Sequence, residues 1–136
     1  MTVYVLDSSA VLRYLDDEAG GERVRSILRA CVAGQVRVHL PAMQWGEIAG
    51  RLRIRLGAPE QTRILGSILP SEVTLVSADA DRALRAAILR VDHKIAYADA
   101  FALDLATDSP DHVLVTADYG FKPFANLARI EFLESK

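Results

Sequence analysis

The stretch VYVLDSS at residues 3–9 decides the fold, because an apolar, β-branched run ends there at a carboxylate. The run predicts a buried strand, and the two serines that follow are typical of a helix N-terminus. We expect Ser8 or Ser9 to cap a helix that begins near Ala10. Asp7 therefore stands at the carboxyl end of the strand, on an edge of the predicted sheet.

Similar apolar runs recur along the chain and alternate with segments of helical periodicity. Continuous apolar strands joined by helices predict a mostly parallel sheet that is covered on both faces. We therefore predict an α/β fold, a three-layer α/β/α sandwich with about five strands. The expected strands are residues 3–6, 36–40, 73–76, 113–116 and 130–133. The expected helices are residues 9–16, 21–33, 42–56, 60–69, 79–92 and 97–107, with a short one near 119–125.

Length and composition indicate one domain over residues 1–136. The 136 residues are 51% hydrophobic and 25% charged, with a formal net charge of −2. This balance excludes the global positive field of an obvious nucleic-acid or membrane-surface binder, so a polyanion needs a local basic patch. No apolar run approaches the roughly 20 residues of a membrane span, and no signal peptide is recognisable, so we expect a cytoplasmic protein. The single cysteine, Cys31, has helical spacing with apolar neighbours and is expected to be a buried thiol.

Four acidic residues fall where a parallel sheet places its site. In such sheets, ligands bind at the carboxyl ends of the strands. Asp7 ends the first strand, and Asp118 follows the fourth. Asp99 lies in the first turn of its helix, where free N–H groups favour an anion, and Glu47 borders the apolar stripe of the helix after Pro41. We expect these four carboxylates to converge on one rim of the sheet.

Each acid also has an ordinary structural explanation. Asp7 could be only a helix cap, Asp118 only a turn residue, and Glu47 the surface partner of Arg51. These explanations do not account for two apolar strands that both end in aspartate. If the acids converge within about 5 Å, each like-charge pair costs about 3 kcal/mol at an effective dielectric constant of about 20. A divalent cation relieves that repulsion, and oxygen ligands without nearby Cys or His select Mg²⁺ or Mn²⁺.

With these acids in place, the sequence resembles the PIN-domain ribonucleases, and among them the toxins of bacterial and archaeal VapBC toxin–antitoxin modules. The matching segments occur in the family's order over nearly the whole chain. They are VYVLDSSAVLRYL, AMQWGEIAGRL, AYADAFALDLA and LVTADYGF. One departure is Gln44, at a place where such toxins often carry asparagine. This departure affects a secondary contact rather than the metal ligands.

The resemblance implies a PIN-like fold and an endoribonuclease that acts as a toxin and inhibits translation. Asp7, Glu47, Asp99 and Asp118 would hold Mg²⁺ or Mn²⁺, and the metal would activate water for attack on an RNA phosphodiester. The implied partners are the RNA substrate, a VapB-like antitoxin whose tail covers the acidic pocket, and a second copy of the chain in a homodimer.

Several other polar residues are weaker candidates for the site. Ser8 and Thr116 are candidates for hydroxyls that orient a ligand carboxylate or a metal-bound water, with cap and turn hydrogen bonds as equal alternatives. Asp104 lies on the same helix as the third acid but points about 140° away around an ideal helix, so it is a lesser candidate. Arg51 and Arg55 share a helix face and are candidates for RNA contact, although a solvated face explains them as well.

Two other functions stay open at the level of sequence. A catalytically silent PIN-like module would bind RNA or protein through the same fold. A phosphoacceptor signalling domain would share the α/β/α architecture and the Mg²⁺, but it needs an acidic pair after the first strand and a lysine after the last. Here Asp7 stands alone, and Lys122 follows the wrong strand.

Overall fold

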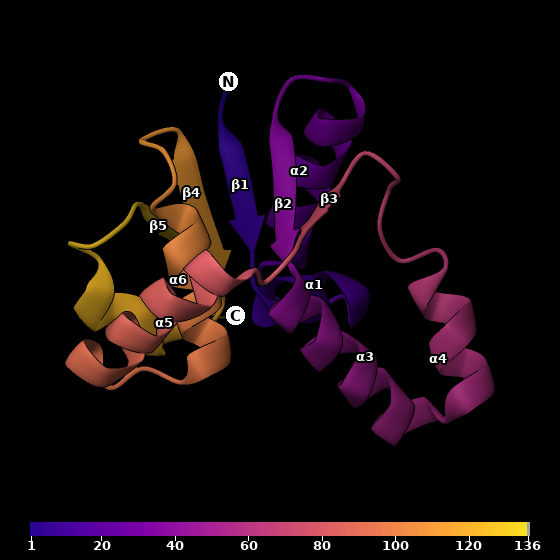
Figure 1. Cartoon of the computed structure of the whole chain (residues 1–136). Coiled ribbons are helices and arrows are strands. Elements are labelled where there is room, and N and C mark those ends of the chain that lie inside the picture. Colours follow the sequence, from indigo (N-terminus) through magenta and orange to yellow (C-terminus); the bar gives the residue numbers. More distant parts are fainter. Residues whose placement is uncertain (136) are drawn as a thin grey trace.

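Five parallel strands form one sheet in the protein, whose computed structural model describes residues 1–135 (Figure 1). The strand order is β3-β2-β1-β4-β5, and every neighbouring pair is parallel. The predicted α/β fold is confirmed, and the sheet is wholly parallel rather than mostly so. The strands are β1 Val3–Leu6, β2 Arg37–Pro41, β3 Thr74–Val76, β4 His112–Thr116 and β5 Ile130–Phe132.

The helices lie close to their predicted positions. The largest difference is in the helix expected over 60–69, which ends at Leu65 because the chain turns at Gly66, a poor helix former. No helix within residues 1–135 is long and apolar enough to cross a membrane. The helices are α1 Ser8–Leu15, α2 Gly21–Val32, α3 Ala42–Leu56, α4 Ala58–Leu65, α5 Ala80–His93, α6 Tyr97–Ala106 and the short 3₁₀ helix η1 Tyr119–Phe124.

Alternate residues of the central strands point into two separate apolar cores. Val5 and Leu114 belong to the core that contains residues of α5 and α6, while Leu6 and Val115 belong to the core of α1, α2 and α3. All four side chains are fully buried, so helices cover both faces of the sheet and the three predicted layers are present. Cys31 lies buried in the second of these cores, as predicted.

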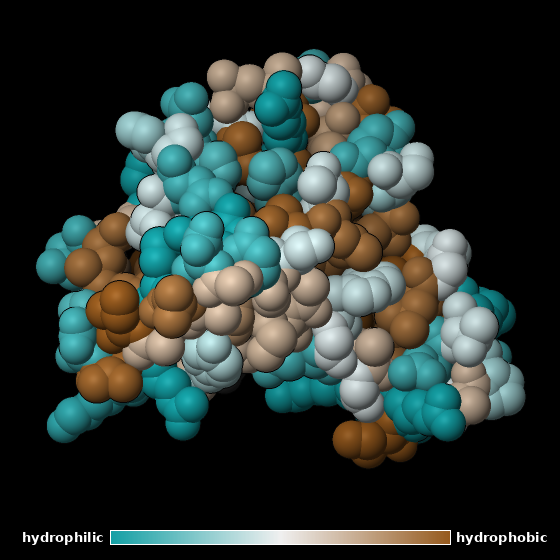
Figure 2. Space-filling view, in the orientation of Figure 1, coloured by the Kyte–Doolittle hydropathy of each residue, from teal (hydrophilic) through white to brown (hydrophobic). Residues whose placement is uncertain are grey.

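Two parts of the helical layers expose apolar side chains at the surface. α3 and α4 form a hairpin that extends away from the sheet (Figure 1), and Ile54 is exposed near its tip. On α5, Leu84, Ile88 and Val91 are exposed at helical spacing, so they share one face of the helix. Apolar surface gathers over α5 at the lower left of the space-filling view (Figure 2).

Candidate active site

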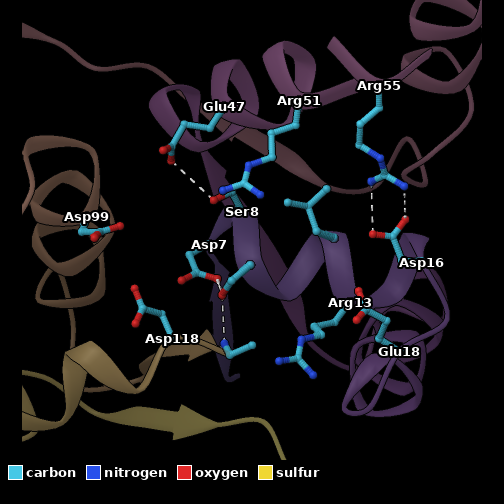
Figure 3. A pocket seen from close by; sticks show the side chains of 13 residues that line it. Asp7, Ser8, Arg13, Asp16, Glu18, Glu47, Arg51, Arg55, Asp99 and Asp118 are labelled. Carbon is cyan, nitrogen blue, oxygen red and sulfur yellow. Dashed lines mark hydrogen bonds and ion pairs between the residues drawn. The ribbon is translucent and has the colours of Figure 1, made fainter. Parts of the chain in front are cut away.

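A pocket of about 440 Å³ opens at the carboxyl ends of β1 and β4 (Figure 3). From β1 the chain builds the sheet through β2 on one side and returns through β4 on the other. Such a switch point is where open α/β sheets bind ligands, because the connections leave a crevice there. All four predicted acids line this pocket, although they come from different elements. They are Asp7, Glu47, Asp99 and Asp118.

Asp7 is almost fully buried and held by three hydrogen bonds. Its Oδ1 accepts from the Ser9 hydroxyl at 2.7 Å and from the Ala10 N–H at 2.9 Å, and its Oδ2 accepts from the Thr116 hydroxyl at 2.5 Å. Asp7 is thus itself the N-cap of α1, and the expected cap by Ser8 or Ser9 is wrong. A carboxylate offers about four acceptor sites, so Asp7 caps the helix and keeps one site free.

The hydroxyls of Ser9 and Thr116 connect the end of β1 to the end of β4. Thr116 donates to Asp7 while its Oγ1 accepts from the Asp118 N–H at 2.9 Å. Ser9 bonds to Asp7 and accepts from the Ala117 N–H at 2.9 Å. These bonds fix Asp118 relative to Asp7. Thr116 was a sequence candidate for such a contact, whereas Ser9 was missed, although it is the second serine of the opening stretch.

Glu47 and Asp99 reach the pocket from two helices. Glu47 is exposed on α3 and accepts a long hydrogen bond from the Ser8 hydroxyl at 3.4 Å, which is the contact that Ser8 makes with an acid. Asp99 is half-buried in the first turn of α6. Within residues 1–135, the alternative ion pair between Glu47 and Arg51 does not form. Glu47 is therefore not held by Arg51 on the surface of α3, and its carboxylate lines the pocket.

Asp118 combines a turn role with its place in the pocket. Its Oδ1 accepts from the Gly120 N–H at 2.8 Å, at the start of η1. Asp7 is thus a helix cap and Asp118 a turn residue, as their ordinary structural explanations predicted. Both side chains also line the pocket, so the local hydrogen bonds set the orientation of two of the four acids.

The four carboxylates act on one another electrostatically. Burial, followed by the charges of Asp7, Asp118 and Glu47, raises the pKa of Asp99 to about 6. Burial also raises the pKa of Asp7, against the lowering effect of its hydrogen bonds. Carboxylates whose pKa values are raised by neighbouring carboxylates form a site that a cation stabilises.

The donor set fits a hard divalent cation. Carboxylate and hydroxyl oxygens line the pocket, whereas Cys31 and the three histidines do not. Oxygen donors of this kind select Mg²⁺ or Mn²⁺ over zinc. Within residues 1–135, no three His, Cys, Asp or Glu side chains are already arranged around one point as a metal site.

Asp104 lies outside the pocket. It is buried on the far side of α6, where it accepts from Arg85 Nε at 2.8 Å and from Arg82 Nη1 at 3.2 Å. Both arginines belong to α5, so the carboxylate ties α5 to α6. Asp104 is offset from Asp99 by about 140° around the helix, so Asp99 faces the pocket while Asp104 faces α5.

Arginines line the side of the pocket away from Asp99 and Asp118, where Asp16 and Glu18 also lie (Figure 3). Arg55 is engaged in a two-point ion pair with Asp16, with both distances 3.2 Å, and Arg13 donates to the Ala19 carbonyl at 3.1 Å. In the part of the chain that the structure describes, Arg51 makes no hydrogen bond or ion pair. Of the two arginines predicted from the sequence, Arg51 is therefore the one available to a ligand. Arg13 was missed because it lies on another helix, α1.

Comparison with known proteins identifies the family to which the sequence is similar. The sequence matches the PIN domain family over residues 4–127. A comparison with curated protein sequences gives no significant match.

Three solved structures show how far the fold is shared. VapBC2 from Rickettsia felis, bound to a promoter DNA fragment, is 15% identical with a TM-score of 0.73, over 98% of this chain and 100% of that chain. DNA-bound VapBC from Salmonella typhimurium is 14% identical with a TM-score of 0.74, over 97% and 98% of the two chains. Mycobacterium tuberculosis VapC20, a sarcin–ricin loop cleaving toxin, is 17% identical with a TM-score of 0.69, over 89% and 94%. At these identities, the likeness establishes a common fold over nearly the whole chain.

Proposed function

The chain belongs to the PIN domain family, and on this basis we propose that it is a metal-dependent endoribonuclease, the toxin of a toxin–antitoxin module. One observation carries the proposal. Acids from four elements of the fold line one pocket, and burial together with the charges of the other three acids raises the pKa of Asp99. A purely structural set of caps and turns has no reason to collect four carboxylates around an open volume.

Asp7, Glu47, Asp99 and Asp118 are the residues that would hold Mg²⁺ or Mn²⁺. When bound, such a cation supplies an activated water for attack on a phosphodiester and neutralises the charge that develops on the phosphate. Asp7 and Asp118 enter the site from strand ends that are bonded to each other. Neither histidine nor lysine lines the pocket in the described part of the chain, so acceptance of a proton falls to carboxylate oxygens.

RNA is the substrate that we infer. Mycobacterium tuberculosis VapC20, which has a similar fold, is a toxin that cleaves the sarcin–ricin loop. Arg51 lies in the same pocket as the acids and is available to bind a phosphate next to the one that is cut. Arg55 reaches a phosphate only if it gives up Asp16, so we assign it a smaller part in binding.

The partner that we infer is a VapB-like antitoxin. The similar structures from Rickettsia felis and Salmonella typhimurium are VapBC complexes. A basic side chain from an antitoxin tail would neutralise the four carboxylates in the absence of metal and would block the pocket. Translation would be inhibited only when the toxin is free of this partner.

A second copy of the chain is the other partner that we infer. Leu84, Ile88 and Val91 present an exposed apolar face on α5, and burial of such side chains against the same face of another copy stabilises a dimer. This surface is separate from the acidic pocket, whose lining contains no residue of α5. Dimerisation therefore leaves the pocket open to RNA.

The experiment that tests the proposed function is RNA cleavage by the purified chain. We expect cleavage with Mn²⁺ or Mg²⁺, loss of cleavage in EDTA, and recovery when Mn²⁺ is restored. A catalytically silent module would bind RNA without cutting it, and that outcome would contradict the proposal. The phosphoacceptor alternative is disfavoured by the sheet, because flavodoxin-type signalling domains have the strand order 2-1-3-4-5 and this chain has 3-2-1-4-5.

A further inference from the structure

One buried amide, that of Gln44, links three of the elements that carry the acids. Gln44 is fully buried in the first turn of α3. Its Oε1 accepts from the Ser8 N–H at 2.8 Å, and its Nε2 donates to the Ala98 carbonyl at 2.8 Å. Ser8 directly follows Asp7, and Ala98 directly precedes Asp99. The two ends of one side chain are therefore bonded beside two acids from different elements.

The third acid lies on the same helix as the amide. Glu47 is three residues beyond Gln44, so it lies about one turn further along α3 and on a neighbouring part of the helix surface. The fourth acid, Asp118, is fixed to Asp7 independently, through the hydroxyls of Ser9 and Thr116. Gln44 is therefore a buried link between the helix-borne acids and the strand-borne ones, in addition to the long hydrogen bond from the Ser8 hydroxyl to Glu47.

The chemistry of the link explains why glutamine suits this position. The Ser8 N–H is one of the free donors at the start of α1, where the Asp7 side chain already accepts from Ala10. The Ala98 carbonyl lies in the first turn of α6. A neutral amide supplies an acceptor and a donor together, which neither an ionised carboxylate nor an apolar side chain does. At the position where such toxins often carry asparagine, this chain therefore has a glutamine that bonds to two different elements.

We propose that Gln44 is a positioning residue that sets the separation of Asp7, Glu47 and Asp99 and thereby the affinity of the pocket for a divalent cation. The inference rests on the proposed function, because it assumes that these acids bind a metal. Replacement of a residue that hydrogen-bonds to and orients metal ligands typically lowers the affinity for the metal by about 10- to 100-fold. Gln44 does not line the pocket, so it acts through the backbone beside the acids.

Two variants separate positioning from general stability. Gln44→Met removes both hydrogen bonds while keeping most of the side-chain volume. Gln44→Asn keeps an amide but is one methylene shorter, so it is too short to hold both partners. Because its side chain is still polar, it serves as the second variant if Gln44→Met does not fold. The matched control is Leu52→Ala, which removes a buried side chain of the same helix that takes no part in the link.

The full chain and each variant are titrated with Mn²⁺ by calorimetry, and exchange of the Ser8 amide is followed by NMR in metal-free protein. We expect the Mn²⁺ Kd to rise at least about 10-fold in both Gln44 variants and to stay within about twofold of wild type in Leu52→Ala. We also expect the Ser8 amide to lose protection in Gln44→Met but not in Leu52→Ala.

Two results would overturn the inference, and they are distinguishable. If wild type binds Mn²⁺ and the Gln44 variants bind it equally well, Gln44 is only a structural residue while the proposed function stands. If wild type does not bind Mn²⁺ at all, the proposed function fails and the positioning role fails with it.

Discussion

The Thr116 hydroxyl donates to Oδ2 of Asp7 at 2.5 Å, and the Oγ1 of Thr116 also accepts from the N–H of Asp118 at 2.9 Å. One side chain at the end of β4 thus holds the acid at the end of β1 and the acid that follows its own strand. Thr116 is fully buried, so neither bond has water as a ready substitute. The separation of these two carboxylates is therefore a property of the folded sheet rather than of flexible loops.

Replacement of this hydroxyl tests the connection between the strands. Thr116→Val keeps the shape of the side chain but removes the donor to Asp7 and the acceptor for the Asp118 N–H. We expect a loss of about 1–3 kcal/mol in the free energy of unfolding, because buried polar groups lose their partner. Urea denaturation measures the loss, and Thr74→Val on the exposed strand β3 is the control. Equal stability of the two variants would contradict the role of Thr116.

The pKa of Asp99 predicts how stability depends on pH in metal-free protein. Its folded value is about 6, against an ordinary value of 3.8, so between these values the folded state holds a proton that the unfolded state has lost. Stability therefore falls as pH rises through this window and stays reduced above pH 6. We expect Asp99→Asn in EDTA to be about 1–2 kcal/mol more stable than wild type at pH 7, after allowance for screening by solvent at this half-buried site.

Urea denaturation of wild type and Asp99→Asn across the acidic and neutral range measures this difference. The advantage of the variant should vanish below the ordinary aspartate pKa, where the carboxyl is protonated in both states. A difference that is absent at pH 7, or that does not shrink on acidification, would show that burial and the neighbouring acids do not raise the pKa of Asp99 as described.

The two arginines predicted from the sequence should differ in RNA binding. Arg51 has no partner in the described residues, whereas Arg55 is paired with Asp16. We expect Arg51→Ala to weaken RNA binding in EDTA and to lower the slope of log affinity against log salt by about 1, because one phosphate contact is lost. Arg55→Ala, on the same helix, should have a smaller effect on binding. Fluorescence anisotropy at several salt concentrations compares them, and equal losses would argue against the distinction.

The exposed face of α5 should control the oligomeric state. Ile88→Glu places a charge in the centre of the apolar face formed with Leu84 and Val91, and we expect it to shift the chain from dimer to monomer. Ile54→Glu is the matched control, because Ile54 is also an exposed isoleucine but lies on α3. Size-exclusion chromatography with light scattering measures the mass. A monomeric wild type, or a dimer that survives Ile88→Glu, would exclude this interface.

The sequence was sufficient to predict the acids but not the side chains that hold them. Asp7 and Asp118 are predictable because apolar strands are visible in hydropathy and parallel strands end on one edge. Ser9 was missed because the Ala117 N–H that it accepts from lies 108 positions away in the chain. The bonds of Gln44 likewise span 36 and 54 positions, and their partners are backbone groups that no residue type marks. Contacts of this kind follow from tertiary packing rather than from local pattern.

We propose that Asp7 and Asp99 bind the catalytic metal, whereas a neighbouring acid, Asp104, only joins helices α5 and α6. The most direct test measures Mn²⁺-dependent RNA cleavage by Asp7→Asn, Asp99→Asn and Asp104→Asn, each verified as folded by circular dichroism. Asparagine is also a good helix cap, so Asp7→Asn should keep α1 intact. We predict that the first two variants lose cleavage while Asp104→Asn retains it, at reduced stability. Undiminished cleavage by both Asp7→Asn and Asp99→Asn would contradict the account.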